Sequence, residues 1–221
     1  MIKHRIIVGL GMLLCVGVVT SARGDDLFPP EWRGGPNSTL QIWEFNTGAN
    51  PALPTSYANP YGTPEATIFG EFNLPKRDTF WLAEDLGHQG VWNIGGAMSF
   101  DIPNDPVLRP FKYIRLQITY DGGWVTPEPQ PWLDVYADNG ATVIESEFVG
   151  RVILDQTYVH DTYDFVLQPN PSHETIWVQP RYCQIYVDEV VIDTICVPEP
   201  STLVTLLIGA MACVVLRKRF R

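Results

Sequence analysis

Residues 111–120 read FKYIRLQITY, and this stretch decides the fold. Every second residue from Ile114 to Tyr120 is apolar, and the residues between them are polar. Successive side chains of a β-strand point to opposite faces of a sheet, so this alternation predicts a strand with one buried face.

Similar patterns recur along the chain, and no apolar run with helical periodicity is longer than a turn or two. Turn sequences such as Asp121-Gly122-Gly123 and Asp138-Asn139-Gly140 separate the runs. We therefore predict an all-β fold, an antiparallel β-sandwich of the jelly-roll type, in one domain over residues 23–196. The other expected strands are Leu40 to Phe45, Ala66 to Phe72, Ala97 to Ile102, Trp132 to Ala137, Thr142 to Phe148, Thr162 to Leu167, Thr175 to Val178 and Gln184 to Ile195.

The last expected strand has a break in its alternation. Ile185 and Val187 keep one phase, whereas Val190 and Ile192 keep the opposite phase. A β-bulge at Asp188-Glu189 explains the break and predicts that Val187 and Val190 both face the core.

Residues 185–193, IYVDEVVID, resemble the closing strand of galactose-binding-like carbohydrate-binding modules. This resemblance implies a glycan ligand and a structural calcium ion beside an acidic residue. Asp188 and Glu189 are the candidate metal ligands, and the alternative is that both are exposed carboxylates at the rim of the sheet.

The C-terminal residues 197–221 have three parts. Pro198, Glu199 and Pro200 precede an apolar run from Ser201 to Leu216, and the basic residues Arg217, Lys218, Arg219 and Arg221 follow it. An apolar run closed by basic residues predicts a transmembrane helix that stops in the bilayer. The three parts resemble the PEP-CTERM sorting signal, which implies that an exosortase processes the protein near Pro198 to Pro200.

The N-terminal residues 1–22 predict a signal peptide. Lys3 and Arg5 precede an apolar run from Ile6 to Val19, and small residues lead to a cleavage site after Ala22. The alternative is a retained membrane anchor. Both ends predict export through the inner membrane, with signal peptidase as a further partner, and a final location at the cell surface or outside the cell.

Charge limits the partners of the exported part. Between residues 23 and 200 the chain has nine basic and 25 acidic residues, a net charge of −16. This charge excludes nucleic acid and opposes polyanionic glycans unless divalent cations bridge the two.

Only two cysteines, Cys183 and Cys196, belong to the exported part. An oxidising compartment favours a disulfide between them. A single strand of these residues holds the two sulfur atoms about 40 Å apart, however, so only a sharp hairpin near Asp188 allows the bond.

Aromatic residues mark two Pro-rich loops, around Tyr57 and Tyr61 and between Trp124 and Trp132. Aromatic rings stack on sugar faces, so these four residues are candidate ligand-binding residues. The alternative is that Trp124 and Trp132 belong to the core.

Catalytic motifs are lacking. His88, His160 and His173 have no metal-ligand spacing, and the pairs His160-Asp161 and His173-Glu174 are expected at the surface. We therefore expect a surface or extracellular-matrix protein that binds glycan or polysaccharide. A hydrolase or lyase on the same scaffold and a purely structural protein remain the alternatives.

Overall fold

The computed structural model describes residues 26–70, 78–121, 131–137, 140–181 and 184–197. These residues form strands, turns and connections without a helix, so none of them forms a helix that could cross a membrane. The predicted signal peptide, the Pro198 to Pro200 motif and the apolar tail lie outside the described residues.

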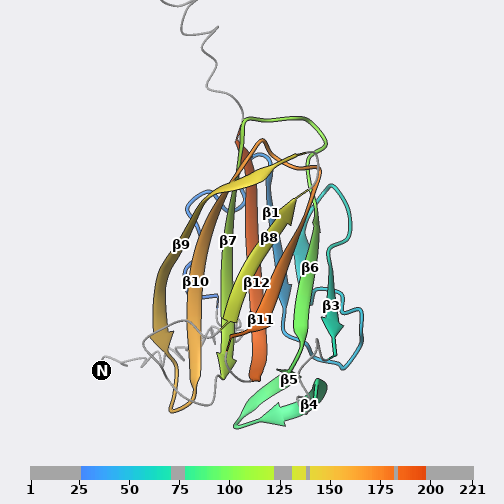
Figure 1. Ribbon diagram of the computed structural model, residues 1–221, viewed down its shortest axis with the longest axis vertical. Coiled ribbons are helices and arrows are strands. Elements are labelled where there is room, and N and C mark those ends of the chain that lie inside the picture. The colour runs from blue at the N-terminus through green and yellow to red at the C-terminus, as the bar shows by residue number, and fades with distance from the viewer. Residues whose placement is uncertain (1–25, 71–77, 122–130, 138–139, 182–183, 198–221) are drawn as a thin grey trace, which may run out of the picture.

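The described part of the chain is a two-layer antiparallel β-sandwich (Figure 1). One layer, sheet A, contains eight strands in the order β2-β1-β12-β7-β10-β9, with β5 joined to β12 and β4 to β5. The other layer, sheet B, has the order β3-β6-β11-β8. The strands are β1 (Ser38–Trp43), β2 (Ser56–Ala58), β3 (Glu65–Phe69), β4 (Phe80–Asp85), β5 (His88–Ile94), β6 (Ala97–Pro103), β7 (Phe111–Asp121), β8 (Pro131–Ala137), β9 (Thr142–Ile153), β10 (Tyr158–Gln168), β11 (His173–Pro180) and β12 (Ile185–Val197).

Strand β7 confirms the alternation in its sequence. Ile114, Leu116, Ile118 and Tyr120 are fully buried against sheet B. The strand lies inside sheet A, between β10 and β12, with Leu116 opposite Tyr163 on one side and Ile192 on the other. Because both neighbours supply apolar residues to the same face, the pattern of β7 sets the core side of the whole sheet.

The core fills the space between the two sheets. Trp43 from sheet A meets Phe100 from sheet B edge to face, with ring centroids 4.9 Å apart. Both side chains are completely buried, and one continuous apolar cluster includes residues of both sheets. Burial of this apolar surface is the main stabilising contribution to the fold.

All nine predicted strands are present, but three further strands were not predicted. The hairpin of β4 and β5 lacks a clean alternation, and a tight turn at Leu86 and Gly87 joins its strands, where φ is 50° and 96°. Gly90 is required in β5, since an added Cβ would lie 2.5 Å from the carbonyl oxygen of Phe45. The third strand that was not predicted, β2, lies within the predicted Pro-rich loop around Tyr57 and Tyr61.

The predicted bulge is confirmed. The pairing of β12 with β7 shifts between Val187 and Glu189, and Val187 and Val190 are both fully buried. At the same point β12 changes its other neighbour, from β5 to β1. The bulge therefore accommodates the change of partner strand.

Candidate functional site

A short N-terminal segment lies on the face of sheet A that points away from sheet B. We call residues 26–37 the strap. Within it, Arg33 and Gly35 donate backbone hydrogen bonds to the carbonyl oxygens of Pro30 and Trp32, both at 3.0 Å. Two positive φ angles, 74° at Gly34 and 63° at Asn37, let the chain turn sharply there before it enters β1. The strap therefore holds a defined shape above the sheet.

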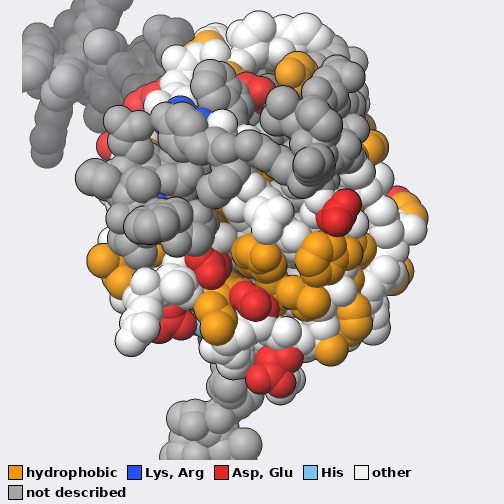
Figure 2. Space-filling view, turned by 60° about the horizontal axis from the view of Figure 1, so that its bottom comes forward, with side chains coloured by type: hydrophobic (Ala, Val, Ile, Leu, Met, Phe, Trp, Pro, Cys, Tyr) orange, Lys and Arg blue, Asp and Glu red, His pale blue; other side chains and the backbone are white. Residues whose placement is uncertain are grey.

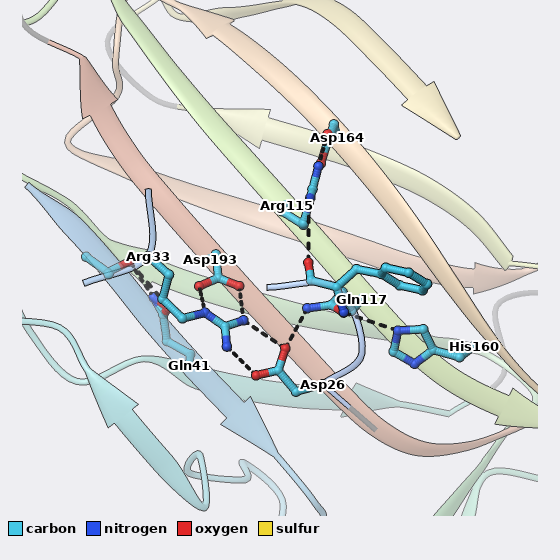
Figure 3. Close-up of polar contacts among 10 residues, drawn as sticks. Asp26, Arg33, Gln41, Arg115, Gln117, His160, Asp164 and Asp193 are labelled. Carbon is cyan, nitrogen blue, oxygen red and sulfur yellow. Dashed lines mark hydrogen bonds and ion pairs between the residues drawn. The ribbon is translucent and has the colours of Figure 1, made fainter. Parts of the chain in front are cut away.

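Arg33 fixes the strap to the sheet (Figure 3). Its guanidinium lies between two carboxylates, with Nε 2.6 Å from Asp193 Oδ1 and Nη2 2.6 Å from Asp193 Oδ2, and it also contacts Asp26. Burial alone would raise the pKa of Asp26, but hydrogen bonds from Arg33 and Gln117 hold it below its ordinary value. The fully buried Asp193 of the sheet is therefore paired with a charged partner, Arg33 of the strap.

A second set of contacts holds the beginning of the strap. The backbone N–H of Phe28 donates to Gln117 Oε1 at 2.7 Å, and Arg115 donates to the carbonyl oxygen of Phe28 at 3.3 Å. Beneath Phe28, one ring nitrogen of His160 lies 3.2 Å from Gln117 Oε1 (Figure 3), and the other lies 2.9 Å from the hydroxyl oxygen of Thr119. Both imidazole nitrogens are occupied, so His160 is a positioning residue rather than a candidate acid or base.

The expectation that His160 and Asp161 form a surface pair is wrong. Strap residue Phe28 lies 6.1 Å from the His160 ring, between centroids, and the imidazole is buried. Asp161 points to the other side of β10, into the core, where Arg151 Nε lies 2.6 Å from its Oδ1 and the Tyr120 hydroxyl donates to its Oδ2 at 2.8 Å. Neither side chain was recognisable as buried, because aspartate is mostly exposed in proteins and histidine has only intermediate burial.

Beside the strap is a groove that we call the acidic groove. It has a volume of about 190 Å³, and the side chains that line it include those of Trp32, Tyr113, Glu145, Glu147 and Asp164. Tyr113 is 40 % exposed. The strap supplies the indole, and strands β7, β9 and β10 supply the other side chains.

Strand register explains why these side chains meet. Glu147 lies opposite Asp164, and Glu145 lies opposite Val166, which in turn pairs with Tyr113. Arg115 holds Asp164 with two hydrogen bonds of 2.7 and 2.6 Å, so this carboxylate has a fixed orientation. Glu145 and Glu147 stand side by side on one strand instead of facing each other across the groove.

A second, wider groove lies on the other side of Arg33, with a volume of about 690 Å³. Strap residues, the start of β1 and the edge strand β2 form its walls, and the predicted ligand residue Tyr57 lies among them, 47 % exposed. Tyr61 is half-buried and is not part of this wall, and its backbone N–H donates to Asn59 Oδ1 at 3.0 Å. The structure thus separates the two predicted tyrosines.

The predicted metal ligands have other contacts. Asp188 Oδ2 lies 2.6 Å from His88 Nδ1, and Glu189 is 4 % exposed, so the alternative that both are exposed rim carboxylates is wrong. Within the described ranges no three His, Cys, Asp or Glu side chains gather as a metal site. A structural calcium ion remains a prediction from the resemblance alone.

The His88 end of the sandwich is also built for structure. His88 Nε2 lies 3.3 Å from Asp155, and its ring stacks on Tyr158 with centroids 3.7 Å apart. Carboxylates therefore contact both ring nitrogens of His88. Figure 2 shows this end, near the β4–β5 hairpin, with hydrophobic side chains interspersed among acidic ones.

The other two predicted aromatic ligand residues are Trp124 and Trp132. Trp124 lies outside the described residues, and of Trp132 only the backbone is described, paired with Gln179 at the edge of sheet B. The prediction for the loop between them stays a prediction.

Cys196 is a buried free thiol, and Cys183 lies outside the described residues.

Sequence reasoning missed Trp32, Tyr113 and the glutamates of β9 as a group. The alternation of β7 and β9 places Tyr113, Glu145 and Glu147 on outward faces, but only the tertiary structure brings the strap over them.

Comparisons with protein families, with curated proteins and with solved structures gave no match to this chain.

Proposed function

We propose that this chain is an exported surface or extracellular-matrix protein whose sandwich, of the jelly-roll type, binds glycan in the acidic groove. The observation that carries the proposal is the combination of two aromatic side chains, Trp32 and Tyr113, with three carboxylates in one groove. Aromatic rings stack on the apolar faces of sugars, and carboxylates accept hydrogen bonds from hydroxyl groups.

The charge of the groove limits the ligand. Glu145, Glu147 and Asp164 together, in a protein whose exported part carries a net charge of −16, repel uronic acids and sulfated sugars. Neutral sugars and amino sugars remain. An amino sugar adds an ammonium group that pairs with the carboxylates, so we expect it to bind more tightly at low salt.

Binding is favoured over catalysis by the arrangement of the acidic residues. Glycoside hydrolysis requires two carboxyl groups on opposite sides of the scissile bond. Glu145 and Glu147 project from the same face of β9, and Asp164 is held by Arg115. A surface that holds glycans in this way also suits a protein anchored among extracellular polymer, where many weak contacts add up.

The test is retention on polysaccharides in affinity electrophoresis. Trp32→Ala should weaken retention on a neutral or amino-sugar polymer about tenfold, a loss of about 1.4 kcal/mol. Tyr136→Ala is the matched control, because Tyr136 is 59 % exposed on β8, away from the groove, and should leave retention unchanged. If the native protein passes through every polymer without retardation, the purely structural role replaces this proposal.

A further inference from the structure

Three polar side chains meet inside the sandwich, away from the acidic groove. Lys112 near the start of β7 and Glu174 near the start of β11 point into the space between the sheets, and Asn104 follows the last residue of β6. Lys112 and Glu174 are completely buried, and Asn104 is 4 % exposed. Lysine and glutamate are rarely buried to this degree, so this cluster requires an explanation.

The contacts within the cluster join all three residues. Lys112 Nζ lies 2.8 Å from Glu174 Oε1 and donates a hydrogen bond to Asn104 Oδ1. The Asn104 carboxamide in turn donates from Nδ2 to Glu174 Oε2. The lysine amine therefore touches the carboxamide of Asn104, while one carboxylate touches both groups.

We propose that Lys112 and Asn104 form an intramolecular isopeptide bond and that Glu174 transfers the protons. Proton transfer from the Lys112 ammonium to Glu174 gives a neutral amine, which is a nucleophile, and a neutral carboxylic acid.

The reaction balances without an oxidant or a cofactor. Lys112 Nζ attacks Cγ of Asn104, and Glu174 protonates the carboxamide as the bond from Cγ to Nδ2 breaks. Nδ2 leaves as ammonia, and the second proton of Lys112 Nζ passes to Glu174, which ends as a neutral carboxylic acid. The product is an amide between the two side chains, and both buried charges have been removed.

The site has the features that such a reaction needs. All three groups are in contact in the folded chain, so the reaction is unimolecular and no translational entropy is lost. Neighbouring strands hold both ends of the cluster, since Lys112 pairs with Leu167 and Cys196, and Glu174 pairs with Ile102. The bond connects the end of a sheet B strand to the start of a sheet A strand.

Peptide mapping of the full-length chain by mass spectrometry tests the proposal. The peptide that contains residues 104–112 should be lighter than its sequence mass by one ammonia, and trypsin should no longer cut after Lys112. Cleavage after Leu108 by chymotrypsin, between the two linked residues, should leave two peptides still joined. A peptide of full sequence mass that trypsin cuts after Lys112 overturns the proposal.

Two variants separate the roles of the residues. Asn104→Asp should lose water in place of ammonia, because the leaving group is then a hydroxyl. Glu174→Gln keeps the shape of the side chain but cannot accept a proton, so the fragments should separate after chymotrypsin. If the two chymotryptic peptides of Glu174→Gln stay joined, the proposed role of Glu174 is wrong. The mass of the native peptide decides whether the bond forms, even if both variants fail to fold.

Discussion

His88 Nδ1 lies 2.6 Å from Oδ2 of Asp188, the residue that the bulge of β12 displaces from its pairing with β7. The contact joins the β4–β5 hairpin to the body of sheet A. The bulge thus has two effects, since it changes the partner of β12 and turns a carboxylate toward the histidine.

Stability should therefore fall as the pH rises through the pKa that His88 has in the folded protein. Burial alone would lower the pKa of His88, but the hydrogen bond and charge of Asp188, with those of Asp155, raise it above its ordinary value. Because the pKa of His88 is higher in the folded state, the charged histidine stabilises the protein fully below its unfolded-state pKa of about 6.5. This stabilisation is lost as the pH rises through the folded-state pKa.

Melting temperatures measured across this range, with His88→Gln as the control, test the expectation. The variant should be about 1 to 2 kcal/mol less stable than the native protein at low pH, where the native histidine is charged, and its stability should not fall as the pH rises through the folded pKa of His88. Identical pH profiles for the two proteins would contradict a role for this pair.

The strap gives a second prediction. Replacing Arg33 with Met leaves the fully buried Asp193 without its guanidinium partner, so we expect a loss of about 3 to 5 kcal/mol in the free energy of unfolding. The double change Arg33→Met with Asp193→Leu should recover most of it, because no unpaired charge remains. Denaturant titration of the two single variants and the double variant gives the coupling energy between Arg33 and Asp193. A coupling energy near zero would contradict the prediction.

The bulge of β12 gives a third prediction. Val187 and Val190 are fully buried on either side of the phase break. An aspartate at either position buries an unpaired charge, so Val187→Asp and Val190→Asp should each destabilise by several kcal/mol in thermal melts. Tyr186→Asp, at the half-buried position directly before Val187, is the control and should cost much less.

Much of the fold was predictable because it depends on local pattern. The alternation of β7, the phase break of β12 and the turn residues each report the environment of a single strand. The β4–β5 hairpin was missed because β4 is at the sheet edge with most of its side chains exposed or half-buried, so alternation is weak there.

The sites were less predictable because they depend on contacts between distant segments. Asp26 and Asp193 lie far apart in the chain, and only the folded strap brings them to opposite sides of Arg33. Lys112 and Glu174 each look like ordinary surface residues in the sequence, and nothing local distinguishes a buried charge from an exposed one.

The last prediction concerns sorting. Replacement of Pro198, Glu199 and Pro200 by alanines removes the motif that we expect a processing enzyme to recognise, but it leaves the apolar run and the basic residues Arg217, Lys218, Arg219 and Arg221 in place. We therefore expect the variant to stay in the membrane at the mass of the unprocessed chain, whereas the native protein is cleaved and released. Fractionation and immunoblotting of cells that express an exosortase measure both forms, and cells without that enzyme provide the control. A variant that is released normally, or a native protein of one mass in both kinds of cell, would show that the tail is an ordinary membrane anchor.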